Sequence, residues 1–222
     1  MKIGITGGIG SGKSYVCRLL TAHYGIEVYD CDAAAKRLMR MSGELRQQLT
    51  ALVGPDCYLQ EEQPPASHHS PLTPYFSPLN KAAVARFLLA SEENAHAIDA
   101  IVHPAVFKDF EQSGLDWMES AILFESGANK LVDRVVVVTA PEETRISRVM
   151  QRDGISREKA LEWMGRQWPQ DEVRRRADFE ICNDSEADLD QQIATLLTSL
   201  KLTALNSSPQ LSILNSQLSI LN

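Results

Sequence analysis

The chain has 222 residues, of which 44% are hydrophobic and 23% charged, a composition typical of a folded globular protein with a sizeable core. Its net charge of −7 argues against a general nucleic-acid binder, because such a protein needs a dense basic surface to displace counterions. An anionic nucleotide ligand would therefore require positive groups gathered locally. The N-terminus lacks the apolar core of a signal peptide, and no apolar run approaches the ~18 residues of a membrane span. We expect a cytoplasmic protein that binds neither membrane nor nucleic acid.

The four cysteines predict no disulfide or zinc framework. They form no CxxC pair, and their spacings match no zinc pattern. We expect free thiols at Cys17, Cys31, Cys57 and Cys182.

The first 30 residues predict a strand, a helix and a second strand. Residues 2–6 are apolar and β-branched and stop at a glycine pair. Residues 14–24 carry apolar side chains at helical spacing and end at Gly25. Residues 26–29 form the second short strand. This order is typical of an α/β protein with a parallel sheet.

The middle of the chain has a helical pattern with one long interruption. Residues 33–53 predict one helix, and the proline-rich residues 54–79 predict a long surface loop. Helical patterns resume at Lys81 and again at residues 94–102. The pair His103-Pro104 predicts a helix break there, since proline disfavours helical geometry in the residue before it.

The sheet pattern then returns, and a helical pattern closes the chain. Three further strands are expected at residues 120–124, 134–139 and 179–182. The second of these has no alternation, as expected of a strand covered on both faces. Two helical segments are expected at residues 142–167, interrupted at Gly154, and at residues 189–200.

Residues 7–14 read Gly-Gly-Ile-Gly-Ser-Gly-Lys-Ser and fit the phosphate-loop pattern G-x-x-x-x-G-K-[ST]. Glycines let successive backbone N–H groups curl around a phosphate, and the following helix directs its positive N-terminus into the same nest. In this pattern Lys13 bridges the β- and γ-phosphates of ATP, and the Ser14 hydroxyl ligates Mg²⁺. The alternative is a glycine turn that binds nothing, but the strand before the loop and the helix after it argue against that.

A GTP-dependent switch protein is disfavoured. The guanine-reading NKxD pattern is absent, because the Asn80-Lys81 pair is followed by two alanines, and no DxxG switch occurs. The phosphate loop therefore predicts an ATP-dependent protein.

Asp30 and Asp32 stand where the second strand ends and the next helix begins. The carboxyl ends of parallel strands meet at one crevice, so we expect these carboxylates to face the γ-phosphate. A kinase needs such an acceptor to orient the attacking hydroxyl and take its proton. Either carboxylate can instead cap the helix. Since one can cap while the other acts, Asp32 is our candidate for the chemistry.

The motifs along the chain form an ordered set. The set comprises TGGIGSGKS, the Asp-x-Asp strand end followed by AAAKR, then IVHP, ILFESG, RVMQRDGIS and ADFEICND. In this order, over almost all of residues 1–200, they resemble the dephospho-coenzyme A kinase family. The resemblance implies transfer of the ATP γ-phosphate, with Mg²⁺, to the ribose 3′-hydroxyl of dephospho-coenzyme A. That reaction is the last step of coenzyme A biosynthesis.

The resemblance also implies an architecture. It implies a P-loop NTPase core with a parallel sheet flanked by helices, an inserted helical substrate domain and a helical lid. The expected core combines residues 1–32, 105–147 and 177–200. The substrate-binding insertion takes residues 33–104 and the lid residues 148–176, and a tail of unknown role takes residues 201–222.

Roles for individual residues follow from the matching positions. The ATP loop would comprise Gly8, Gly10, Ser11, Gly12, Lys13, Ser14 and Tyr15. The catalytic group would comprise Asp32 and Lys13, with Arg152 from the lid, where Arg148 would also bind ATP. His103 would lie by the substrate together with Asp32. Tyr15 stands where the family usually has threonine, and Asn80 where many members carry arginine.

Glu125 has two interpretations. It either contacts the metal or substrate or is a charge at a strand end.

The arginines of the later helices also have alternative interpretations. Arg145, Arg148 and Arg152 share one helix face, which a lid could bring to the transferring phosphoryl group. The alternative is a solvated face paired with neighbouring glutamates, which we favour for Arg145, as we favour the lid for Arg152. The run of arginines at 174–176 is interpreted as a solvated helix.

Two other functions remain open. One is a different P-loop small-molecule kinase, acting on a nucleoside monophosphate, shikimate or gluconate. The other is a regulator that holds ATP without transferring its phosphate.

Overall fold

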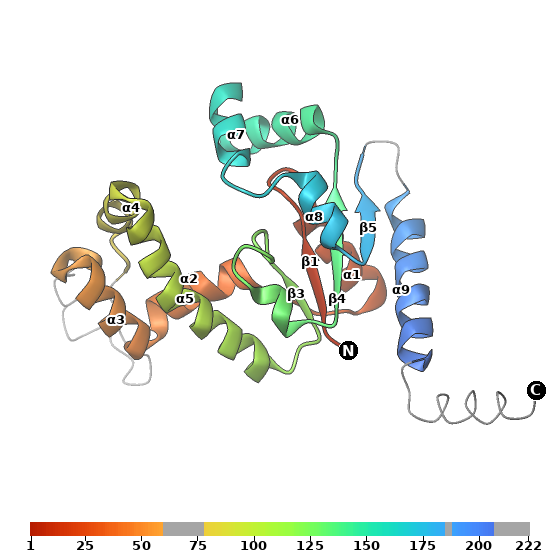
Figure 1. The fold of residues 1–222 in the computed structure, drawn as a ribbon, viewed down its shortest axis with the longest axis horizontal. Helices are drawn as coiled ribbons and strands as arrows, with labels where there is room; N and C mark the ends of the chain where they lie inside the picture. Colours follow the sequence, from red (N-terminus) through yellow and green to blue (C-terminus); the bar gives the residue numbers. More distant parts are fainter. Residues whose placement is uncertain (60–77, 185–187, 207–222) are drawn as a thin grey trace, which may run out of the picture. The chain divides into compact units, whose positions relative to one another are not determined.

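The computed structural model describes residues 1–59, 78–184 and 188–206 (Figure 1). Within these residues the strands form a five-stranded sheet in the order β2-β3-β1-β4-β5. Their bounds are β1 Ile3–Thr6, β2 Val28–Asp30, β3 Trp117–Glu119, β4 Arg134–Thr139 and β5 Phe179–Cys182. The pairings of β1 with β3, β1 with β4 and β4 with β5 are parallel. The predicted α/β class with a parallel sheet is confirmed.

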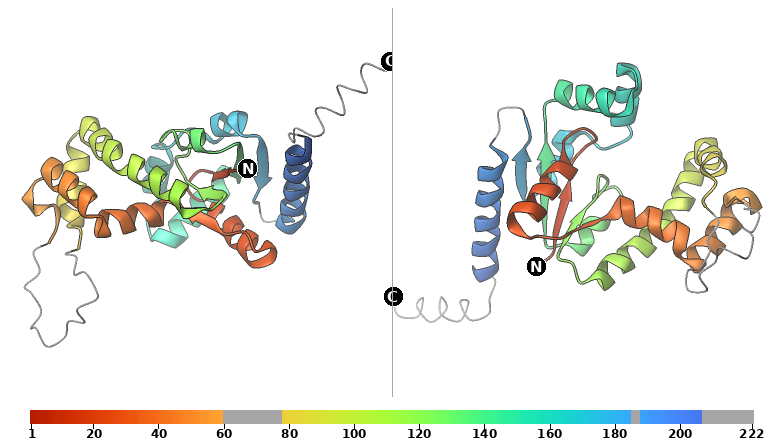
Figure 2. Two further views of the ribbon diagram at one scale, coloured as in Figure 1. Left: turned by 90° about the horizontal axis from the view of Figure 1, so that it is seen from below. Right: turned by 180° about the vertical axis from the view of Figure 1, so that it is seen from behind.

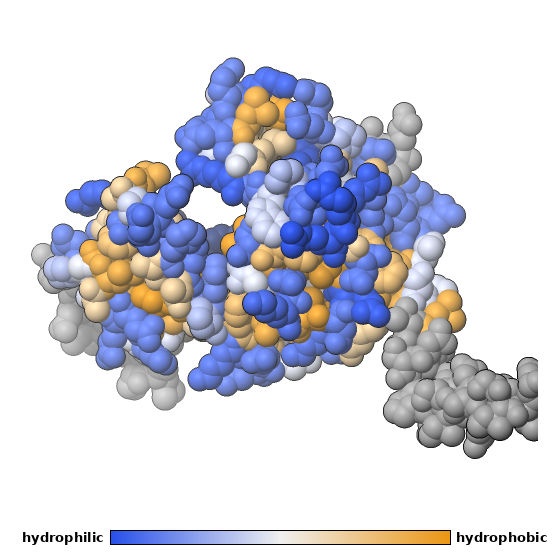
Figure 3. Space-filling model, viewed as in Figure 1, coloured by the Kyte–Doolittle hydropathy of each residue, from blue (hydrophilic) through white to orange (hydrophobic). Residues whose placement is uncertain are grey.

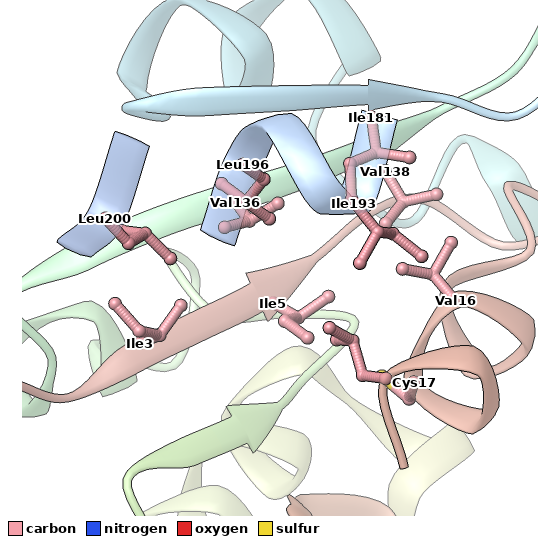
Figure 4. Close-up of a cluster of buried hydrophobic side chains, with 11 residues drawn as sticks. Ile3, Ile5, Val16, Cys17, Val136, Val138, Ile181, Ile193, Leu196 and Leu200 are labelled. Atoms are coloured by element: carbon pink, nitrogen blue, oxygen red, sulfur yellow. The ribbon is translucent and has the colours of Figure 1, made fainter. Parts of the chain in front are cut away.

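The central strands are covered on both faces, as the unbroken valine run predicts. Val135, Val136, Val137 and Val138 of β4 are all buried. One face of the sheet packs against α1, Lys13–Tyr24, and α9, Leu189–Asn206 (Figure 2). Figure 4 shows side chains from both helices meeting isoleucines and valines of β1, β4 and β5. Each such buried aliphatic side chain stabilises the fold by about 1.5–3 kcal/mol relative to exposure.

The first helix begins and ends at glycines with left-handed backbone. Gly12 precedes α1 with φ 87°, and Gly25 follows it with φ 65° and donates to the carbonyls of Leu20 and Thr21. A left-handed residue at a helix end is readily adopted only by glycine. The predicted end of this helix at Gly25 is confirmed.

Three short helices follow β4 in the chain: α6, Glu142–Asp153; α7, Arg157–Met164; and α8, Gln170–Arg176. Gly154 ends α6 with φ 65°, so the interruption predicted there is confirmed. Ile146, Val149 and Ala160 form a second apolar cluster, against which Ile9 packs. The surface around α6 and α7 is mostly hydrophilic in the view of Figure 3. The arginines of α8 pair with Glu172 and Glu180 at exposed positions, which confirms the solvated helix.

The edge strand β5 is closed at its end by a side chain of α9. Gln192 accepts a hydrogen bond from the Cys182 amide at 2.9 Å and donates one to the Cys182 carbonyl at 3.0 Å. The side-chain amide therefore occupies both backbone groups of this residue, as a neighbouring strand would. Devices of this kind protect sheet edges from pairing with other chains.

The chain divides into two compact units. One contains Met1–Val28 and the described residues from Asp116 onward, and the other is Tyr29–Leu115. The second unit is helical: α2, Cys31–Met41; α3, Gly43–Val53; α4, Lys81–Ala90; and α5, Glu92–Ser113, with a short 3₁₀ turn at Pro55–Cys57. Helix α5 packs against each of the other three helices. The division into core, substrate insertion and lid stays a prediction.

A buried tyrosine joins three parts of the helical unit. The Tyr29 hydroxyl donates to the Asp109 carboxylate at 2.7 Å, and Arg37 of α2 donates to the same oxygen at 2.6 Å. The Tyr29 ring packs against Phe110. Burial and then the Asp109 carboxylate raise the pKa of Tyr29 well above its usual value. Asp109 of α5 therefore ties together the two ends of the segment that contains Asp32.

Two helix predictions in this unit were wrong. The single helix expected over residues 33–53 is two helices, because Ser42 ends α2 and caps α3 by accepting from the Leu45 amide. The break expected at His103-Pro104 does not occur, since α5 runs through Pro104. Proline removes one helical hydrogen bond. Burial of Ile98, Val102, Val106 and Phe110 along one side of α5 outweighs that loss.

The strand expected at residues 120–124 was also misplaced. The strand is β3, three residues long, and its last ladder bond is from the Ser120 amide to the Ile5 carbonyl at 3.0 Å. Residues 121–127 form turns instead. Among their apolar side chains Leu123 is buried by packing rather than by pairing, since a Cβ added at Gly4 would lie 2.9 Å from it, whereas Ile122 is exposed.

Most of the proline-rich segment and most of the tail lie outside the described residues. Of the expected loop over residues 54–79, the described ends meet where Tyr58 pairs with Leu79. Helix α9 extends to Asn206, beyond the end predicted at Leu200. Among the described helices, none combines the length and hydropathy needed to cross a membrane.

Candidate active site

The phosphate-loop sequence forms a tight turn between β1 and α1. Gly10 and Gly12 both have left-handed backbone, with φ 81° and 87°. The Ser11 amide donates to the Gly8 carbonyl at 3.0 Å, and the Tyr15 amide donates to the Gly12 carbonyl at 2.9 Å. The strand, glycine turn and helix thus follow one another as the pattern requires.

A carboxylate from the neighbouring strand contacts the loop. One oxygen of Glu119, at the end of β3, lies 2.5 Å from the Lys13 ammonium and accepts a hydrogen bond from the Ser14 hydroxyl at 2.7 Å. The register places Glu119 beside Ile5, two residues before the loop. Burial alone would raise the pKa of Glu119, but the Lys13 charge and hydrogen bonds from Lys13, Ser14 and Cys17 together lower it. The carboxylate is therefore ionised and pairs with the central cation of the loop.

Sequence reasoning missed Glu119. The strand expected from the sequence began at Ser120, one residue after Glu119. The carboxylate at the carboxyl end of this strand was therefore taken to be Glu125. A carboxylate at the carboxyl end of the strand next to the phosphate loop was the available signal. The Glu125 carboxylate accepts a hydrogen bond from the Trp168 amide at 3.1 Å, so it has a structural partner.

Helix α6 holds the outer side of the loop. Arg145 is buried and its Nε donates to the Ile9 carbonyl at 3.0 Å. Burial lowers the pKa of its guanidinium. The solvated position favoured for Arg145 was therefore wrong, because the loop itself covers this side chain. Arg148 lies further along the same helix, with Nη1 3.4 Å from the carbonyls of both Gly10 and Ser11.

The other arginine expected in a lid is exposed. Arg152 forms a hydrogen-bonded ion pair with the adjacent Asp153, with the closest atoms 2.7 Å apart. The next segment of chain contacts the loop through Gln167, which accepts from the Ile9 amide at 2.7 Å. Trp168 stacks on Phe124 with its ring centroid 6.2 Å away. These contacts hold the segment after α7 against the phosphate loop and Phe124, which belong to the same unit.

Two candidate residues belong to the helical unit. Asp30 caps α2, since its carboxylate accepts from the Ala33 amide at 2.9 Å. Asp32 lies in the first turn of α2 and is exposed. His103 is half-buried, stacks on Phe107 and has its Nε2 3.6 Å from Asp99. The cap is therefore made by Asp30 and not by Asp32.

Several residues that the sequence predicted, and Glu119, contact the phosphate loop, whereas others contact different residues. Lys13, Ser14, Glu119 and Arg148 meet at or beside the glycine turn, whereas Arg152 faces its neighbour Asp153. In the part of the chain that the structure describes, no three His, Cys, Asp or Glu side chains gather as a metal-binding group. The Ser14 hydroxyl and the Glu119 carboxylate place two oxygen-bearing groups at the loop.

Solved structures share this fold. The crystal structure of TT1252 from Thermus thermophilus matches with a TM-score of 0.72 at 32% identity, covering 90% of this chain and 97% of that one. The dephospho-CoA kinase from Campylobacter jejuni matches with a TM-score of 0.58 at 20% identity, covering 90% and 98%. A shikimate kinase from Acinetobacter baumannii gives 0.52 at 18% identity, covering 90% and 94%. With the glycine loop between β1 and α1, these likenesses define a P-loop fold.

Sequence comparisons then identify the family. The family model described as Dephospho-CoA kinase matches residues 1–189. A dephospho-CoA kinase from Bacteroides fragilis is 38% identical over 207 residues, which cover 90% of this chain and 93% of the relative. One from Chlorobaculum tepidum is 33% identical over 208 residues, covering 89% and 94%. The chain belongs to the dephospho-CoA kinase family, as its motifs indicated.

Proposed function

We propose that this protein is a cytoplasmic kinase that transfers the γ-phosphate of ATP to the ribose 3′-hydroxyl of dephospho-coenzyme A. This reaction completes coenzyme A biosynthesis. The observation that carries the proposal is the family match over residues 1–189, together with a loop whose Lys13 and Ser14 share the Glu119 carboxylate. A nucleotide triphosphate is the ligand that such a loop recognises by its charge.

The loop residues would bind ATP by exchanging partners. In the structure Lys13 is paired with Glu119. With ATP present, its ammonium turns to the β- and γ-phosphates, while amides of Gly8, Gly10 and Gly12 line the phosphate nest and the Ser11 and Tyr15 amides hold the turn around it. Arg148 is already beside the loop, and Arg152 would leave Asp153 to reach the transferring phosphoryl group. These arginines would then neutralise charge that develops during transfer.

The donors at the loop fit Mg²⁺. This ion prefers oxygen ligands and usually keeps several waters, using one or two protein groups and the substrate phosphates. Ser14 would hold the ion directly, and Glu119, once it releases Lys13, would hold it directly or through water. Bound there, Mg²⁺ would neutralise charge on the phosphates.

Asp32 would align the acceptor hydroxyl and take its proton. Because Asp30 makes the helix cap, the carboxylate of Asp32 is available in the exposed first turn of α2. General-base catalysis of this kind contributes roughly 10²–10⁴-fold to a rate. His103 and Glu125 would contact the substrate, with residues 33–104 forming the substrate domain and residues 148–176 the lid.

The direct test is mass-spectrometric detection of coenzyme A formed from ATP and dephospho-coenzyme A. Shikimate, gluconate and nucleoside monophosphates serve as competing acceptors in the same assay. Phosphorylation of one of these instead, with dephospho-coenzyme A left unchanged, would assign a different small-molecule kinase. Tight ATP binding without any phosphorylated product would indicate a regulator.

The role of Asp32 is tested by Asp32→Asn, with Asp30→Asn as the matched control. Asparagine caps a helix as well as aspartate does, so the control removes a nearby charge while keeping the cap. We expect Asp32→Asn to lower turnover by about 10²-fold or more and to leave ATP affinity nearly unchanged. Asp30→Asn should keep most of the activity. Normal turnover by Asp32→Asn would remove this residue from its role.

A further inference from the structure

The phosphate loop is held from outside through its carbonyl groups. Arg145 donates to the Ile9 carbonyl at 3.0 Å, and Asn183 donates to the Ser11 carbonyl through Nδ2 at 2.8 Å. Arg148 adds longer contacts of 3.4 Å to the carbonyls of Gly10 and Ser11. Hydrogen bonds weaken at that length, so Asn183 is the principal partner of the Ser11 carbonyl.

The orientation of a carbonyl fixes the orientation of the following amide. A trans peptide is planar, and its C=O and N–H point in opposite directions. When Asn183 holds the Ser11 carbonyl on the outer side, the Gly12 N–H must face the other way, into the nest. Gly12 has φ 87°, and glycine adopts positive and negative φ about equally readily, so its own backbone preference does not fix the orientation of the Ser11–Gly12 peptide. An external hydrogen bond is therefore what selects one peptide orientation.

Asn183 is itself firmly placed. It follows β5 directly, is 6% exposed, and its own amide donates to the Thr139 carbonyl of β4 at 2.7 Å. Its carbonyl accepts from Arg148 at 3.2 Å. The sheet thus presents this side chain to the loop from a rigid position.

The loop is shaped to receive Asn183. A Cβ added at Gly12 would lie 1.9 Å from the Asn183 Nδ2 atom. The side-chain amide therefore occupies the space that any larger residue at position 12 would need. The second glycine of the loop pattern is required both for its backbone conformation and for this contact.

We propose that Asn183 is a positioning residue of the phosphate site: by holding the Ser11 carbonyl outward it keeps the Gly12 N–H turned toward bound phosphate. The inference rests on the nucleotide-binding part of the proposed function. It assigns a role to the ADFEICND motif, which places this amide at the end of β5.

The test compares Asn183→Asp with Gln192→Glu. Each variant replaces by an acid a side-chain amide that donates to a backbone carbonyl. Asn183 donates to Ser11 of the loop, whereas Gln192 donates to Cys182 at the end of β5 and does not contact the loop. The probe is Mg-ADP, with its dissociation constant measured by titration calorimetry at pH 5.5 and pH 8. Thermal unfolding of each nucleotide-free variant shows that it is folded.

A protonated acid can still donate to the Ser11 carbonyl, whereas an ionised one cannot. We therefore expect Asn183→Asp to weaken ADP binding about tenfold or more relative to wild type at pH 8, with a smaller ratio at pH 5.5. Gln192→Glu should stay within about twofold of wild type at both values. Should Asn183→Asp fail to fold, Asn183→Ala takes its place, with an expected weakening of about threefold to tenfold at both pH values.

Wild-type ADP affinity in the folded Asn183 variants, or an equal loss in Gln192→Glu, would overturn the inference. The outcome is separable from that of the proposed function. If the wild type binds ADP but does not phosphorylate dephospho-coenzyme A, the comparison of ADP affinities still decides the role of Asn183. If the wild type makes coenzyme A and the variants bind ADP normally, this inference alone fails.

Discussion

Replacing Glu119 by glutamine should separate the two interactions of Lys13, one with the Glu119 carboxylate and one with the phosphates of ATP. The substitution keeps the shape of the side chain and removes its charge, so the nucleotide-free protein loses the 2.5 Å ion pair. Lys13 is then left with its charge and without its carboxylate. A bound triphosphate can supply the missing negative charge, so nucleotide and Glu119 are competitors for one cation.

The structure sets the size of the effect. At an effective dielectric constant of about 20, unit charges separated by the 2.5 Å of this pair attract by roughly 7 kcal/mol. The two side chains are only 13% and 10% exposed, so desolvation offsets most of that attraction. Removing one partner of a fully buried pair costs about 3–5 kcal/mol, and the residual exposure here reduces this to about 2–4 kcal/mol. The thermal midpoint of a chain this long should fall by roughly 5–15 °C.

The assay is thermal unfolding without nucleotide, followed by titration of ATP with and without Mg²⁺. Without the metal, Glu119→Gln should bind ATP about tenfold more tightly than wild type, since no carboxylate competes for Lys13 or repels the phosphates. With Mg²⁺ the ATP affinity of the variant should equal or fall below that of wild type, because the variant lacks a ligand for the ion. Glu180→Gln is the matched control, since its pair with Arg174 is more exposed and its loss should matter little.

Two results would refute this reasoning. If Glu119→Gln is as stable as wild type without nucleotide, the ion pair contributes nothing in solution. If the metal-free ATP affinities are equal, Glu119 does not compete with phosphate for Lys13.

Three further outcomes follow from the described contacts. Gly10→Ala should abolish measurable ATP binding, because residue 10 has a φ of 81° that alanine rarely adopts and the new Cβ would lie 2.5 Å from the Arg145 carbonyl oxygen; normal binding in titration calorimetry would contradict this. Asp109→Ala should destabilise the protein by about 1–3 kcal/mol in urea, because the Tyr29 hydroxyl loses its short partner; Asp99→Ala, beside His103, is the control and should cost less. The lowered pKa of Glu119 means that its contribution to stability is present above the ordinary glutamate pKa of about 4.3 and is lost as the pH falls through the lowered value. The stability difference between wild type and Glu119→Gln should therefore shrink from pH 6 to pH 3, and a difference that stays constant would exclude this ionisation.

The parts of the fold that the sequence predicted well are those where local pattern and tertiary environment agree. The strands at 134–139 and 179–182 have the predicted bounds, because each is a short apolar run between polar residues. Glycines at 25 and 154 mark helix ends because few other residues adopt left-handed backbone there.

The failures have a common physical origin in tertiary contacts. Pro104 breaks the local rule for helices, but four buried side chains along α5 keep the helix continuous. The apolar run after Glu119 looked like a strand because a short apolar run does not distinguish a strand from a series of turns that buries one side chain, here Leu123. Its error of a few residues was enough to hide the carboxylate that contacts Lys13.

The residues of the candidate site also fall into those that local sequence predicts and those that only tertiary contacts bring together. The glycine loop is a local signature, so Lys13 and Ser14 could be found from spacing. The outer contacts come from residues more than 130 positions away along the chain, such as Arg145 and Asn183. Only the fold brings them to the loop, and a single sequence carries no signal for such pairings.

The position of β1 in the sheet affects the order in which the chain can fold during synthesis. Its two neighbours, β3 and β4, begin at residues 117 and 134, whereas β1 ends at Thr6 and is translated long before them. The helical unit Tyr29–Leu115 is continuous in sequence and is translated between β1 and β3. We therefore expect β1 to stay unpaired until β3 and β4 have been translated, so the nucleotide site forms only after the helical unit has been made.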